Sequence, residues 1–219
     1  MIAFLLLLVG SSVFAQSAEN TAMNHLRKNL KELSLTEADI SNYKVNDEVY
    51  TQHNGVTSIY FIQKQEDIEV FNAMINVNIL PNGKILSMGN KYIPNLAEKV
   101  NTTTPQISME NAIAAVQNKF DINTFVPLFE KERISETEAY FEESGIALEP
   151  IKVKLMLQPM EEEVRLAWNV TLYELSAQNW WNARVDAVTG EVLHFYNHVI
   201  HCNFGTPGEV CTEDHAHNH

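Results

Sequence analysis

The chain has 219 residues, enough for one large or two small domains, and its hydrophobic fraction of 45% is ordinary for a globular protein. It carries 15 basic and 28 acidic residues, which give a formal charge of -13. A nucleic-acid-binding protein needs a positive surface that displaces counterions from phosphate. The composition therefore argues against nucleic acid as a partner.

Residues 1–15 have the pattern of a secretory signal peptide. An apolar run over residues 2–9 is followed by small residues, which favours cleavage between Ala15 and Gln16. Only Met1 precedes the run, so the usual positive charge is missing there. A membrane anchor is the alternative, but the run is shorter than the roughly 20 residues that cross a bilayer. We expect a secreted or periplasmic protein with no membrane contact once the signal is removed.

The first half of the mature chain begins with helical spacing and then changes to strand spacing. Met23, Leu26, Leu30 and Leu33 recur at three- and four-residue steps, which predicts a helix. Thr36 has the character of an N-cap for a short second helix. Strands are predicted at residues 43–51, 56–63, 75–79 and 84–88, with turns at 53–55 and 81–83.

The second half repeats this order after a polar stretch without periodicity at residues 94–105. Ser108 is a predicted N-cap, and an apolar stripe from Met109 to Phe120 follows at helical spacing. Strands are predicted at residues 151–158, 164–173, 180–186 and 191–197, with a turn at 187–190.

This order predicts an α+β fold of two small domains, each with an N-terminal helix packed on an antiparallel β-sheet. The predicted division is a signal peptide at 1–15, a first domain at 16–95, a linker at 96–106, a second domain at 107–200 and a tail containing Cys and His at 201–219.

The sequence contains no recognisable catalytic motif. There is no H-E-x-x-H zinc motif, no G-x-S-x-G turn around a nucleophile and no glycine-rich phosphate loop. Acidic residues are plentiful, but no pattern selects a catalytic pair. We therefore expect neither enzymatic activity nor a cofactor, with an unrecognised hydrolase as the alternative.

Cys202 and Cys211 lie close together near the C-terminus. In an oxidising compartment they favour a disulfide around a short loop, worth roughly 2.5–3 kcal/mol if its geometry is unstrained. A zinc site is the alternative, but it needs further ligands at defined spacing.

Three histidines, His215, His217 and His219, end the chain. They could bind Zn²⁺, Cu²⁺ or Ni²⁺, although without a packed surrounding shell such binding would be weak and unselective. The other interpretation is an unstructured tail without a metal.

The segment WWNARVDAVTGEVL at residues 180–193 resembles the closing hairpin of PepSY domains, and LAWNV at 166–170 resembles their penultimate strand. This resemblance implies a PepSY- or cystatin-like second domain. Residues 63–73 together with Gly83, Lys84 and Ile85 are similar to the fungalysin/thermolysin propeptide motif. Asp67 stands where that motif usually has Gly, and Glu69 where it usually has Pro.

Together the two segments resemble the propeptide region of secreted fungalysin/thermolysin-type zinc metalloproteases, with the protease domain absent. The resemblance implies a partner of that class, which this module would inhibit and help to fold. The module could be free-standing or part of a truncated zymogen. Trp180 or Tyr196 could anchor it to the partner, the alternative being an ordinary structural aromatic. The competing hypothesis is an exported ligand- or metal-binding module with no protease partner.

Overall fold

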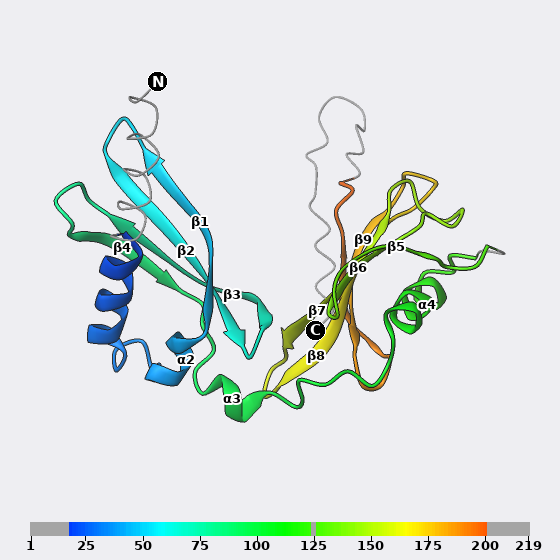
Figure 1. Ribbon diagram of the computed structural model, residues 1–219, viewed down its shortest axis with the longest axis horizontal. Helices are drawn as coiled ribbons and strands as arrows, with labels where there is room; N and C mark the ends of the chain where they lie inside the picture. Colours follow the sequence, from blue (N-terminus) through cyan, green and yellow to red (C-terminus); the bar gives the residue numbers. More distant parts are fainter. Residues whose placement is uncertain (1–17, 124–125, 201–219) are drawn as a thin grey trace, which may run out of the picture.

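The computed structural model describes residues 18–123 and 126–200. They form two hydrophobic cores, each between a helix and one face of an antiparallel sheet. Figure 1 shows the two sheets side by side, with the N-terminal helix (blue) and α4 on their outer sides. We call the part from residue 18 to β4 the first lobe and the part from α4 to β10 the second lobe.

The first lobe is a helix packed on a four-stranded sheet of order β1-β2-β3-β4. Met23 and Leu26 on the helix pack with Ile59 and Ile75 of the sheet, and all four side chains are buried. A helix and four strands occur as predicted, but the helix ends at residue 29, before Leu30 and Leu33, and β3 begins at Ile68, seven residues before the predicted strand. The elements are a helix over residues 18–29, α2 (Glu37–Ser41), β1 (Tyr43–Thr51), β2 (Val56–Gln65), β3 (Ile68–Ile79) and β4 (Ile85–Asn90).

The helix α2 is held by a capping box, which confirms the N-cap predicted at Thr36. The Asp39 N–H donates to Thr36 Oγ1 at 3.3 Å, and the Thr36 N–H donates to Asp39 Oδ2 at 2.8 Å. The Leu96 N–H also donates to Asp39 Oδ1, at 3.0 Å. Burial alone would raise the pKa of Asp39, but these hydrogen bonds outweigh it and hold the pKa below its usual value.

A buried amide fixes the chain where it leaves the first lobe. Gln63 is fully buried, its Oε1 accepts from the Ile93 N–H at 2.8 Å, and its Nε2 donates to the Ile93 carbonyl at 2.9 Å. Both backbone groups of Ile93 are thus satisfied by one side chain.

The predicted linker at 96–106 is ordered and hydrogen-bonded to the second lobe. It begins with the short helix α3 (Leu96–Lys99), and Val100 then forms a parallel bridge with Val164. The Asn101 N–H donates to the Val164 carbonyl at 3.0 Å, and Asn101 Oδ1 accepts from the Leu166 N–H at 2.9 Å. The division of the chain into two domains at this segment stays a prediction.

The second lobe is the helix α4 packed on an antiparallel sheet of order β5-β6-β7-β8-β9-β10. Ile113 and Val116 of α4 are buried with Leu155 and Trp168 of the sheet. The α+β class is confirmed. The elements are α4 (Met109–Lys119), β5 (Glu130–Ser135), β6 (Glu138–Phe141), β7 (Ile151–Pro159), β8 (Val164–Tyr173), β9 (Trp180–Asp186) and β10 (Val192–Asn197).

The hairpin of β5 and β6 is not among the predicted strands. The sequence of β5 is EKERIS, and every residue in it is exposed. An exposed edge strand has no buried face, so it lacks the apolar alternation by which strands are recognised. The hairpin is held by β6, whose Ala139 and Phe141 are fully buried and which pairs with β7.

Candidate functional site

The strand β3 joins the two lobes. Both of its ends pair with β2 of the first sheet, while Val70, between them, forms a parallel bridge with Leu157 of β7 in the second. Asn72 adopts a left-handed conformation with φ of 57°, within the irregular part of the β2–β3 ladder. The side chains of Val70 and Ala73 are buried in the core of the second lobe. A single strand therefore contributes to both cores.

The second lobe buries a guanidinium beside this junction. Arg184 of β9 has no exposed surface. Its Nε donates to Gln158 Oε1 at 3.1 Å, and Nη1 donates to Asn182 Oδ1 at 2.5 Å. Nη2 lies 2.6 Å from Nδ1 of His194, and this nitrogen must be the acceptor because a guanidinium only donates.

Two rings cover the guanidinium. The Arg184 Cζ lies 4.2 Å from the ring centroid of Phe71 on β3 and 5.0 Å from that of Tyr196 on β10. Burial lowers the pKa of Arg184. Within residues 18–123 and 126–200, no carboxylate forms an ion pair with it. Neutral acceptors and aromatic faces therefore stabilise this charge, and Phe71 ties it to the first lobe's strand.

Glu69 links strands of both lobes. Its Oε1 accepts from Lys44 Nζ of β1 at 2.8 Å and from Lys154 Nζ of β7 at 3.0 Å. Burial would raise the pKa of Glu69, but the two ammonium groups outweigh it and lower the pKa. One of the two residues that depart from the propeptide motif thus carries an interaction across the junction.

A cavity of about 240 Å³ lies at the junction. Residues 69–73 of β3 line it together with Ile62, Met74 and Met156. Methionine side chains adapt to irregular shapes, so this wall suits an apolar side chain better than a polar substrate.

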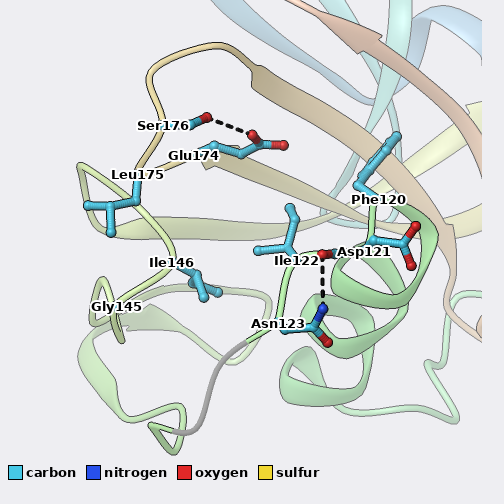
Figure 2. Close-up of a pocket in the computed structure, with 9 residues that line it drawn as sticks. All are labelled: Phe120, Asp121, Ile122, Asn123, Gly145, Ile146, Glu174, Leu175 and Ser176. Atoms are coloured by element: carbon cyan, nitrogen blue, oxygen red, sulfur yellow. Dashed lines mark hydrogen bonds between the residues drawn. The ribbon is translucent and has the colours of Figure 1, made fainter.

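A second cavity of about 220 Å³ lies at one end of the second lobe (Figure 2). Glu174 lines this cavity. The Glu174 carboxylate accepts hydrogen bonds from Trp181 Nε1 at 2.6 Å, Asn179 Nδ2 at 2.9 Å and Ser176 Oγ at 3.0 Å. Two of these donors lie in the loop between β8 and β9, so the carboxylate helps to hold that loop.

Aromatic rings cross the face of the second sheet that lies away from α4. Tyr173 and Trp180 stack with centroids 5.3 Å apart, Trp180 lies 5.2 Å from His198, and His198 lies 4.6 Å from Tyr196. Side chains that alternate along neighbouring strands produce this row. Trp180 and Tyr196, the anchors considered from the sequence, thus belong to one surface.

The described residues hold no group of three or more His, Cys, Asp or Glu that could bind a metal ion. None of their helices is long and apolar enough to cross a membrane.

The site residues predicted from the sequence lie outside the described residues. These are the cleavage position at Ala15 and Gln16, the cysteines Cys202 and Cys211, and the histidines His215, His217 and His219.

Arg184 and Glu69 were not singled out from the sequence. A signal for Arg184 was available, because Trp181, Ala183 and Val185 alternate as one buried face and place the intervening Arg184 on the other. Glu69 was visible only as a departure from a motif, and its two lysine partners are distant in sequence.

Comparison with known families finds a match over the strands of the first lobe. Residues 41–92 match the family described as the Fungalysin/Thermolysin Propeptide Motif. The chain is 28% identical over 156 residues to the extracellular metalloproteinase mep of Aspergillus terreus. It is 29% identical over 157 residues to the protein of the same name in Aspergillus fumigatus.

These matches cover 69% of this chain but only 24% of each relative, so the chain spans about a quarter of the relatives' length. Among solved structures, the C-terminal domain of YpeB from Bacillus megaterium is similar with 12% identity and a TM-score of 0.36, over 83% of this chain and 64% of that one. A TM-score this low does not bear on the fold. The resemblance to the propeptide region of fungalysin/thermolysin-type metalloproteases is confirmed.

Proposed function

We propose that this chain is an exported, propeptide-like module that inhibits a fungalysin/thermolysin-type zinc metalloprotease and assists its folding. The observation that carries the proposal is the match of residues 41–92 to the propeptide motif, within a longer match to extracellular metalloproteinases. The chain supplies shape and surface, and the partner supplies the zinc and the reacting groups.

The junction supports this role because an inhibitor must keep its contact surfaces in fixed positions. Glu69 holds strands of both lobes, and Phe71 packs over Arg184 of the second lobe. Surfaces that are fixed before binding lose less entropy when the partner binds. The formal charge of -13 favours a partner with a basic surface.

Export belongs to the same proposal. Residues 1–15 would direct the chain out of the cytoplasm, with cleavage between Ala15 and Gln16. A disulfide between Cys202 and Cys211 would then form in the oxidising compartment. We also propose that the lobes correspond to a first domain at 16–95 and a PepSY-like domain at 107–200.

Inhibition is tested by adding the purified chain to the active extracellular metalloproteinase mep of Aspergillus fumigatus. Peptide hydrolysis should slow as the chain is added and recover on dilution. Bovine serum albumin, another acidic protein, serves as the control for competition as a substrate. Undiminished hydrolysis at a micromolar excess of the chain contradicts the proposal.

Folding assistance has a separate readout. The denatured protease is diluted into buffer with or without the chain, and the chain is then removed before activity is measured. A higher yield of active protease with the chain supports the assisting role. Equal yields contradict it without bearing on inhibition.

A further inference from the structure

The described residues contain four edge strands: β1 and β4 in the first lobe, and β5 and β10 in the second. An edge strand presents unpaired backbone N–H and C=O groups along one side. Such an edge readily accepts a strand from another chain unless charges or bulges oppose it.

Two of the four edges are protected. The strand β1 contains Lys44, Asp47 and Glu48 and has a bulge between Val45 and Asp47. The strand β5 begins with four consecutive charged residues, EKER. Pairing either edge with another strand would require charged side chains to lose part of their hydration.

The strand β10 lacks this charge, and its register shift lies at its start, between Val192 and His194. Its sequence VLHFYN contains no Lys, Arg, Asp or Glu. Its backbone direction follows from one hydrogen bond, in which the His198 N–H donates to the Trp180 carbonyl of β9 at 2.8 Å. Hydrogen-bonded pairs alternate in an antiparallel ladder, so the backbone N–H and C=O groups of Phe195 and Asn197 point away from β9.

Rings flank this edge on both faces of the sheet. Phe195 is 37% exposed and lies on the α4 side, with its centroid 5.1 Å from that of Phe120. Trp180 is 38% exposed and lies with His198 on the opposite face. A strand added along β10 would therefore find an aromatic contact for side chains on either of its faces.

The strand β4 provides the contrast. Its sequence ILSMGN is also uncharged, but it has no aromatic residue, and Leu86 is its one large hydrophobic residue with a highly exposed side chain, at 56%. Backbone hydrogen bonds alone give little selectivity between partners, and side-chain contacts supply that selectivity. The β4 edge has few such contacts to offer.

We propose that β10 is the docking edge for the partner, and that an extended segment of the metalloprotease adds to it as a further strand. This inference rests on the proposed function. Its occupant is a neutral or basic segment with apolar side chains at alternate positions. A second copy of this chain is disfavoured because both copies carry a formal charge of -13.

Hydrogen exchange of the full chain, alone and with the Aspergillus fumigatus protease, tests the proposal directly. The amides of Phe195 and Asn197 should exchange quickly in the free chain and at least about tenfold more slowly in the complex. The amides of β4 should exchange equally in both. Inhibition without added protection on β10 overturns this inference and leaves the proposed function standing.

Matched truncations give a second measurement. Trp180→Ala should raise the inhibition constant about tenfold, as expected for an exposed tryptophan at the centre of an interface. Leu86→Ala on β4 should leave the inhibition constant unchanged, and urea unfolding checks that both variants fold. Equal effects of the two variants overturn the assignment to β10.

Two further outcomes also overturn it. Slow exchange at Phe195 and Asn197 in the free, monomeric chain would mean that the chain covers its own edge. Protection that appears only with a dimer in light scattering would identify a second copy as the occupant. A wild-type chain that does not inhibit contradicts both this inference and the proposed function.

Discussion

The first lobe buries a neutral amide where the second lobe buries a guanidinium. Gln63 and Arg184 are both fully buried and both lie on central strands. The amide of Gln63 satisfies two backbone groups of Ile93. Arg184 instead donates to side chains of its own sheet and lies against the ring of Phe71 from β3.

This difference follows from what each group must hold. A chain segment that leaves a lobe has one donor and one acceptor per residue, which a single amide can match. A junction between two sheets has several side-chain acceptors and aromatic faces, which a planar group with five donors can match. The amide of Gln63 holds the backbone at Ile93, and the guanidinium of Arg184 contacts Phe71 where the two sheets meet.

The largest effect is expected from Arg184→Met. The substitution keeps most of the volume but leaves Gln158 Oε1 and Asn182 Oδ1 without their donor, so the free energy of unfolding should fall by about 3 kcal/mol. Urea unfolding followed by tryptophan fluorescence measures this, since Trp180 and Trp181 lie on the same strand.

The control is Arg27→Met, which removes an exposed ion pair with Glu37 and should leave the urea midpoint unchanged. If both substitutions lower the free energy of unfolding equally, the buried Arg184 contributes no more to stability than an exposed arginine does.

A smaller effect is expected from Gln63→Met in the first lobe. The side chain keeps its size, but the Ile93 N–H and carbonyl lose their partners, and the free energy of unfolding should fall by about 2 kcal/mol. Circular dichroism during urea unfolding follows this change. Gln65→Met, at a half-buried position two residues later, should cost less. If Gln63→Met costs as much stability as Arg184→Met or more, the buried amide matters at least as much as the buried guanidinium.

The smallest effect concerns the ion pairs of Glu69. Its folded pKa lies below the unfolded one, so its stabilisation is complete above the unfolded pKa and is lost as the pH falls through the folded pKa. The wild type should therefore lose stability as the pH drops from about 6 to about 3. The Glu69→Gln variant should be less stable than the wild type at pH 7, and this difference in stability should disappear in acid.

Urea midpoints of both proteins at several pH values give this result. Asp39 also has a lowered pKa, so the variant should keep part of the pH dependence. A gap that stays constant with pH would mean that the two lysines do not stabilise the junction through charge.

The sequence predicted the features that depend on neighbouring residues. Apolar spacing located the helix over residues 18–29 and α4, and alternation located most strands of both sheets. The Thr36 cap was predictable because a capping box spans only four residues. The turn at 187–190 was predictable because Gly190, with φ of 80°, suits a position that other residues adopt only with strain.

The tertiary structure decided what depends on distant partners. The β5 strand exists because β6 pairs with it, and the ordered segment at 96–107 exists because β8 and Ala187 accept its hydrogen bonds. The burial of Arg184 needs Phe71, which lies 113 positions earlier (184 − 71) in the chain. Periodicity reports which face of an element is apolar, whereas the group that covers that face is set by long-range packing.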